Sequence, residues 1–76
     1  MEVIEVKKKF LENYIGKGFA IPIKNGYADF RKGKHRWHID IRADKKYEID
    51  LSLEDIKSKN EITIPESNGE YKIIIK

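Results

Sequence analysis

Apolar and polar residues alternate through the middle of the chain, and this pattern predicts a series of short strands. The alternation covers residues 19–24, 27–31, 35–42 and 47–53. A period of two places every second side chain on the same face of a strand. Pro22 cannot donate a hydrogen bond to a neighbouring strand, so we expect the first strand at a sheet edge or at a bulge.

Turn signals fall between these segments. Asn25-Gly26 and Asn68-Gly69 combine residues that tolerate a positive φ, which tight hairpin turns require. Two charged turns, Lys32-Gly33-Lys34 and Asp44-Lys45-Lys46, separate the remaining strands. We therefore expect neighbouring strands to pair as antiparallel hairpins.

A last strand is predicted over residues 71–75, which carry apolar side chains on both faces between two lysines. At a sheet edge, such a strand would add a partner's strand by main-chain pairing, unless the lysines block it. In the centre of a sheet, burial on both faces would explain the isoleucines without any function. We prefer the central position and keep the edge as the alternative.

Two helices are expected. Near the N-terminus, apolar residues recur at helical spacing, at Val3, Val6, Phe10 and Tyr14. This spacing predicts a helix over residues 7–15 that ends at Gly16, whereas residues 2–6 fit either a strand or a helix. Ser52-Leu53-Glu54-Asp55 has the form of a capping box and predicts a second, short helix near residues 53–59.

Together these elements predict an α+β fold that is mostly β and forms a single domain over residues 1–76. The strand number and spacing favour a small curved antiparallel sheet, or an SH3- or OB-like barrel of five to six short strands. A flat sheet with the N-terminal helix packed across it is the alternative. The chain has no linker, repeat or low-complexity segment.

Composition narrows the range of functions. The chain has 76 residues, no cysteine and two histidines, which excludes disulfides and thiolate metal sites. A domain of this size buries too little surface for a deep catalytic cleft, so we expect binding without a cofactor rather than catalysis. The order of charged and apolar residues at the N-terminus predicts no signal peptide, and no apolar run is long enough to span a membrane, so we expect a cytoplasmic protein. A homodimer would add stability to so short a chain.

The most informative segment is the basic turn at residues 31–38. The formal net charge of +3 is a mild basic bias, and four cations fall within this turn and its flanks. The first prediction is therefore a nucleic-acid-binding domain that uses this hairpin and the adjoining sheet face. The phosphate-binding residues would be Arg31, Lys32, Lys34 and Arg36, and the rings stacked on bases would come from Tyr27, Trp37 or Tyr47. The alternative is that the cations keep a hairpin tip solvated and that Trp37 is a core residue.

Two other functions are alternatives to nucleic-acid binding. A protein-binding module or inhibitor, such as a mobile element encodes, would act through a sheet edge or the charged hairpin. A minimal ribonuclease would use one strand face, with His38 for proton transfer, Asp40 to orient it and Arg36 to hold an anion. His35 or Glu48 would be the second proton carrier. No metal site is expected, because a spacing of three on a strand sends His35 and His38 to opposite faces.

Overall fold

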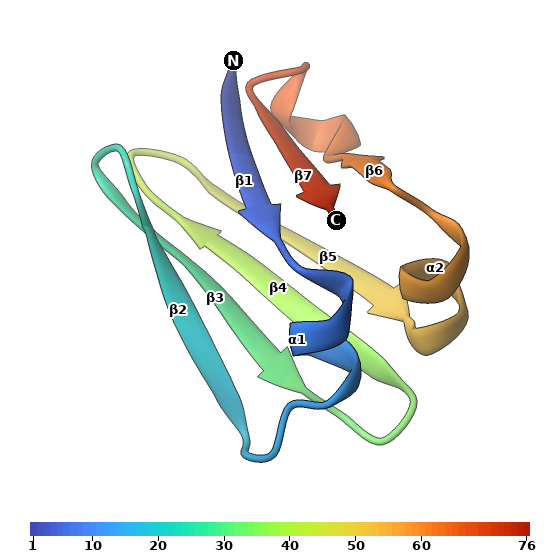
Figure 1. Cartoon of the computed structure of the whole chain (residues 1–76). Helices are drawn as coiled ribbons and strands as arrows, with labels where there is room; N and C mark the ends of the chain where they lie inside the picture. Colours follow the sequence, from blue (N-terminus) through green and yellow to red (C-terminus); the bar gives the residue numbers. More distant parts are fainter.

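The computed structural model describes residues 1–76 and contains two β-sheets and two short α-helices (Figure 1). The larger sheet has the order β2-β3-β4-β5, and the smaller sheet has the order β1-β7-β6. The strands are β1 (Glu2–Val6), β2 (Gly18–Ile23), β3 (Gly26–Lys32), β4 (Arg36–Arg42), β5 (Lys46–Ser52), β6 (Glu61–Thr63) and β7 (Tyr71–Ile75). The helices are α1 (Lys8–Glu12) and α2 (Leu53–Ser58), with a 3-10 turn η1 at Pro65–Ser67.

The larger sheet is an antiparallel meander, as the alternation predicts. Pro22 lies on β2, an edge strand. Ile23 pairs with Gly26, so the predicted hairpin turns one residue earlier than Asn25-Gly26, through residues 24–25, with Asn25 at φ 63°. Gly26 has a different role, because a Cβ there would lie 1.8 Å from the carbonyl oxygen of Arg42 on the adjoining chain segment.

The smaller sheet forms from the two ends of the chain. Residues 2–6 are a strand, which pairs in parallel with β7 and aligns Ile4 with Ile73. The β-branched residues of this segment favour a strand over a helix. The helix expected over 7–15 covers only Lys8–Glu12. β7 lies between β1 and β6, so the preferred central position of residues 71–75 is confirmed and the alternative edge position is wrong.

The second helix begins as the capping box predicts. The Ser52 hydroxyl accepts from the Asp55 backbone N–H at 3.0 Å, and the Asp55 carboxylate accepts from the Ser52 backbone N–H at 3.4 Å. Leu11 on α1 and Ile56 on α2 are the residues that the helices bury in the core. Neither helix has the length and apolar character needed to cross a membrane.

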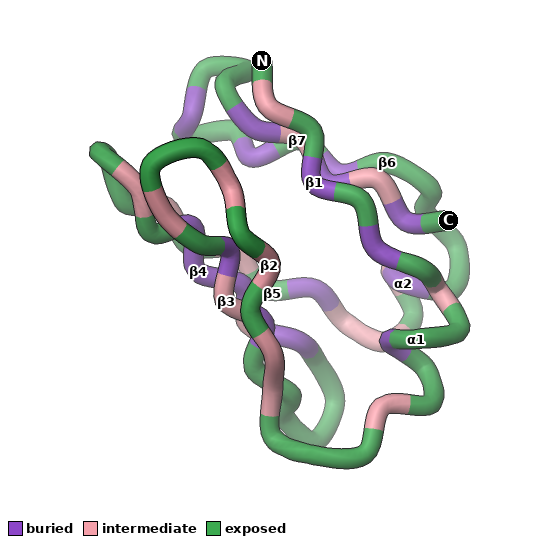
Figure 2. Tube along the Cα trace, turned by 60° about the vertical axis from the view of Figure 1, so that its left-hand side comes forward, coloured by how far each residue is buried: buried purple, intermediate pink, exposed green.

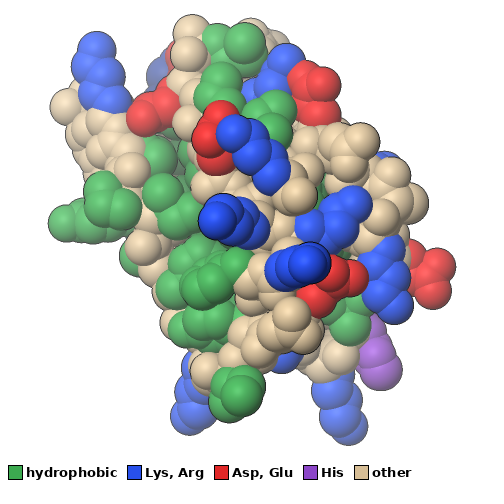
Figure 3. All heavy atoms as spheres, in the orientation of Figure 1, with side chains coloured by type: hydrophobic (Ala, Val, Ile, Leu, Met, Phe, Trp, Pro, Cys, Tyr) green, Lys and Arg blue, Asp and Glu red, His purple; other side chains and the backbone are tan.

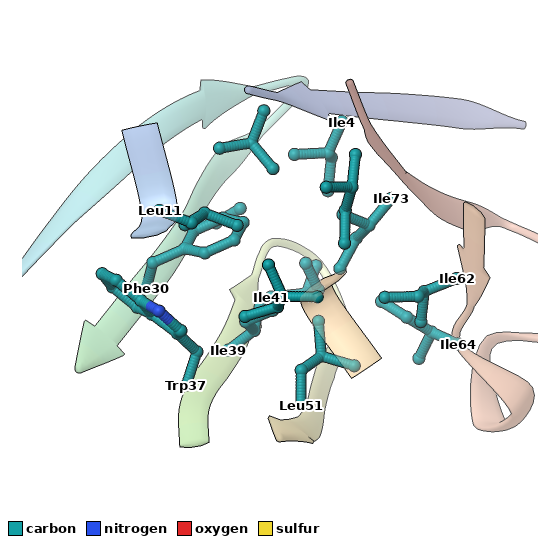
Figure 4. Close-up of a cluster of buried hydrophobic side chains, with 14 of the residues drawn as sticks. Ile4, Leu11, Phe30, Trp37, Ile39, Ile41, Leu51, Ile62, Ile64 and Ile73 are labelled. Atoms are coloured by element: carbon teal, nitrogen blue, oxygen red, sulfur yellow. The ribbon is translucent and has the colours of Figure 1, made fainter. Parts of the chain in front are cut away.

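The core lies between the two sheets, with the helices at one end (Figures 1 and 2). Phe30, Trp37 and Ile39 from the larger sheet face Ile4 and Ile73 from the smaller sheet (Figure 4). The fold is therefore α+β and mostly β, as predicted. The two sheets do not close into the expected barrel, because the chain ends pair with each other and not with the edges of the meander.

The centre of the smaller sheet gives a direct test of this core. Ile73 is fully buried, whereas Ile15 is 96% exposed. We expect Ile73→Ala to lower the free energy of unfolding by about 2–5 kcal/mol, because it leaves a cavity between the sheets. Ile15→Ala, the same truncation at the surface, should change it by less than about 0.5 kcal/mol. Urea denaturation followed by the fluorescence of Trp37 measures both, and equal effects would contradict the described core.

Candidate functional site

The four cations of the predicted phosphate-binding hairpin do not form one free patch. Alternation along β3 and β4 places Arg31 and Arg36 on the outer face of the larger sheet. Lys32 points the other way and its ammonium donates to the Tyr14 carbonyl at 2.6 Å. Lys34 is exposed in the turn between the strands. Both arginines face carboxylates, with Arg31 3.3 Å from Asp40 and Arg36 3.8 Å from Asp50.

The three predicted stacking rings also lie apart. Trp37 is fully buried, with Tyr14 and Phe19 each 5.6 Å away between ring centroids, so it offers no face to a base. This corrects the stacking assignment of Trp37 and favours its alternative as a core residue. Tyr47 is half-buried against the core. Tyr27 is 55% exposed, but its register partner Arg42 places it at the far end of the sheet from the basic turn.

A polar network occupies the centre of the outer sheet face, and its middle is His38. Its Nδ1 lies 2.6 Å from an oxygen of Asp50, and its Nε2 lies 2.9 Å from Asp40 and 3.4 Å from Glu48. Strand register brings these residues together, because Asp50 is opposite His38 and Glu48 is opposite Asp40. The predicted contact of Asp40 with His38 is present. The contact of Asp50 was not predicted, although its place on the polar side of residues 47–53 is visible in the sequence.

Arginines complete the network. The side chain of Asp40 is only 8% exposed, and its Oδ2 faces Arg31 at 3.3 Å and Arg42 at 3.6 Å. Arg42 also pairs with Asp29 at 2.9 Å. A buried carboxylate needs such partners, since an unpaired one would be strongly disfavoured. The outer face therefore carries nearly balanced charges and not the free cations that phosphate binding needs.

The network shifts the pKa of both central groups. The hydrogen bond to Asp50 raises the pKa of His38, and Asp40 adds to this effect against the opposing influence of burial. Burial acts to raise the pKa of Asp40, but the charge and hydrogen bond of His38 outweigh it, so this pKa is lowered. The folded state therefore favours an imidazolium between carboxylates.

The same contacts limit the chemistry predicted for His38. Both ring nitrogens already face carboxylates, so neither is free to exchange a proton with a substrate. Arg36 reaches this group only through Asp50. Of the two predicted second proton carriers, His35 lies in the exposed turn outside the network, whereas Glu48 lies 3.4 Å from Nε2 of His38. When His38 is neutral, its Nε2 and the carboxylates of Asp40 and Glu48 form a candidate metal-ligand set, because these atoms all lie within 4.8 Å of one another.

A second surface carries lysines without carboxylate partners. Every arginine of the chain lies in an ion pair, whereas the lysines of α1, of the α1–β2 loop, of the β3–β4 turn and of α2 have none. We call this surface the lysine end. It consists of Lys7, Lys8, Lys9, Lys17, Lys32, Lys34 and Lys57.

Backbone and side-chain contacts hold the segments of the lysine end together. Lys8 donates to the Lys57 carbonyl at 3.0 Å, which joins α1 to α2, and the Lys32 N–H donates to the Lys17 carbonyl at 2.8 Å. The Leu53 N–H donates to the His35 carbonyl, which joins α2 to the β3–β4 turn. Figure 3 shows blue side chains over α1 and at the lower end of this face, where these segments lie in Figure 1.

Two apolar side chains are exposed within the lysine end. Phe10 is 47% exposed, and its ring lies 5.4 Å from Tyr14 and 4.9 Å from Phe19 between centroids. Ile15 is 96% exposed in the loop that follows. The lysine end therefore combines free cations with an aromatic ring supported by other rings.

Comparison with known proteins identifies no relative: no family model matches the chain, and neither a curated protein nor a solved structure matches it significantly.

The shifted pKa values predict a pH dependence of stability. The pKa of His38 is raised from 6.5, so its contribution is complete below 6.5 and is lost as the pH rises through the folded value. The pKa of Asp40 is lowered from 3.8, so its contribution is present above 3.8 and is lost as the pH falls through the folded value. We therefore expect the network to stabilise the fold most between these limits.

The measurement is the free energy of unfolding of the wild type and of His38→Gln, obtained from urea titrations across the pH range with a metal chelator present. The difference between the two proteins should be largest in mildly acidic buffer and should shrink as the pH rises above 6.5 through the folded pKa of His38. His35→Gln is the control, because the side chain of His35 lies outside the network. A difference that grows toward alkaline pH would contradict the charged imidazolium.

Proposed function

We propose that this protein binds a nucleic acid through the lysine end. The observation that supports the proposal is the contrast between the two charged surfaces. Arginines on the outer sheet face are neutralised by carboxylates at 2.9–3.8 Å, whereas the lysines around α1 have no carboxylate partner. Unpaired cations attract phosphates and release their counterions on binding, which supplies most of the affinity for a nucleic acid.

The exposed ring of Phe10 supports the same function. Stacking of a base on an aromatic ring contributes about 1–3 kcal/mol and tolerates any sequence. Phe10 rests edge-on against Tyr14 and Phe19, so little side-chain freedom is lost when a base stacks on it. Lys9 precedes it on α1, and Lys32 contacts the Tyr14 backbone beside it. A single-stranded segment would thus find phosphate and base contacts next to each other.

The proposed surface differs from the one that the sequence predicts, although the function is the same. Lys32 and Lys34 belong to both surfaces, whereas Arg31 and Arg36 are held by carboxylates and Trp37 is buried. Phe10 replaces the three rings named from the sequence. The contact surface is therefore the end of the molecule with the helices and not the open face of the larger sheet.

A protein partner is the second candidate, and β5 is the observation that favours it. No strand pairs with the outer edge of β5, and Lys46, Glu48 and Asp50 are exposed along it. Backbone groups of a free edge pair readily with an extended segment of another chain. A complex of this kind would survive nuclease treatment and would not depend on the lysine end.

Two sets of lysine substitutions, one in the lysine end and one away from it, distinguish the effect of local contacts on affinity from the effect of net charge. We expect the triple variant Lys9→Gln, Lys17→Gln, Lys34→Gln to bind a mixed-sequence single-stranded oligonucleotide about tenfold or more weakly than the wild type. The salt dependence should also fall, by about 0.7 in the slope for each phosphate that the variant no longer neutralises. Fluorescence anisotropy at two salt concentrations measures both.

The matched control is Lys24→Gln, Lys45→Gln, Lys46→Gln, which removes the same charge from lysines that lie away from α1 and have no ion pair. Its affinity should stay close to that of the wild type. Equal losses in the two triple variants would show that only net charge matters. Wild-type affinity that does not change with salt would remove the proposal.

A further inference from the structure

The outer sheet face holds a histidine in an unusual environment. Nδ1 and Nε2 of His38 both lie close to carboxylate oxygens, at 2.6 Å from Asp50 and 2.9 Å from Asp40. A neutral imidazole carries a proton on only one nitrogen. If Asp50 accepts the Nδ1 proton, the lone pair of Nε2 faces the lone pairs of Asp40 and Glu48. A cation must then lie between them, and it is either a proton or a metal ion.

We propose that His38, Asp40 and Glu48 form a binding site for a divalent first-row metal ion, with Zn²⁺ as the best-fitting ion. The ligand atoms would be Nε2 of His38 and one oxygen from each carboxylate. Bonds of about 2.0 Å in tetrahedral geometry place ligand atoms about 3.3 Å apart. Nε2 lies 2.9 Å from Asp40 and 3.4 Å from Glu48, so these two distances are already close to this spacing.

Strand geometry fixes two of the ligands before any metal arrives. His38 and Asp40 are two residues apart on β4, a central strand, so their side chains leave the same face. Glu48 is the register partner of Asp40 on β5. The Glu48 side chain is 71% exposed, so it is free to rotate toward a bound ion.

Neighbouring residues hold the proposed ligands in a fixed orientation, as the hydrogen-bond partners of metal ligands commonly do. Asp50 accepts from Nδ1 of His38, which leaves Nε2 as the ligand nitrogen, and such carboxylate–histidine pairs are common at metal sites. Arg31 and Arg42 both approach Oδ2 of Asp40, so Oδ1 stays directed toward His38. The position of the two ligands on β4 is therefore maintained by contacts that the metal would not disturb.

Three protein ligands leave at least one coordination position for water, and the outer face of the sheet is not covered by another element. The site is independent of the lysine end and of the proposed nucleic-acid binding. Because imidazole favours Zn²⁺ and similar ions over Mg²⁺ and Ca²⁺, we expect selectivity for first-row metals.

The test uses the full chain after removal of metal by a chelator. Calorimetric titration with Zn²⁺ should show one site, and Co²⁺ should give the visible absorption of a four-coordinate ion. His38→Ala should abolish both signals. Asp50→Asn leaves the ligands in place and should weaken Zn²⁺ binding by about 10–100-fold, as loss of an outer carboxylate does.

His35→Ala is the matched control, since it removes the other histidine from an exposed turn, and it should bind Zn²⁺ as the wild type does. Circular dichroism shows whether His38→Ala folds. If it does not fold, Glu48→Gln takes its place as the variant that lacks a ligand, because Glu48 lies at an exposed position. Absence of binding in the wild type with Zn²⁺ in large excess would overturn the site. Equal loss in His35→Ala, or full binding by His38→Ala, would do the same.

Discussion

The alternation of side chains along β4 is the constraint on which the rest of the molecule depends. Trp37, Ile39 and Ile41 are fully buried on one face, while His38 and Asp40 leave the other face. A shift of one residue would bury the charged set and expose the tryptophan, so the register is strongly specified. The alternation of side chains that builds the core therefore also brings His38 and the carboxylates together. A change of register would disturb both the core and this polar network.

Local sequence patterns were sufficient to predict the meander and the start of α2. Strand alternation, the hairpin near Asn25 and the capping box at Ser52 each depend on residues that are close in sequence, and each is present. The pairing of β1 with β7 joins residues about 70 positions apart, and no local pattern specifies it. For the same reason the contact between His38 and Asp50 required the register of two strands, which hydrophobic spacing alone does not fix.

The basic turn shows why a count of charges is a weak guide to a binding surface. Arg31 and Arg36 stood out in the sequence as phosphate ligands, yet both face carboxylates that adjoining strands supply. The planar guanidinium group suits such pairing, whereas the flexible ammonium of a lysine is more strongly hydrated and stays in solvent. The lysines of the first helix and of the basic turn, such as Lys9 and Lys34, therefore keep their charge unpaired, whereas the arginines of the strands do not.

The central position of β7 has a consequence for how the chain acquires its structure. The last strand separates β1 from β6, so the first strand has no neighbour until residues 71–75 leave the ribosome. Until then the smaller sheet is incomplete and does not cover the apolar face of the meander. The nascent polypeptide must therefore include β7 before this domain can fold cooperatively, and a chain that stops before residue 71 would remain open to aggregation.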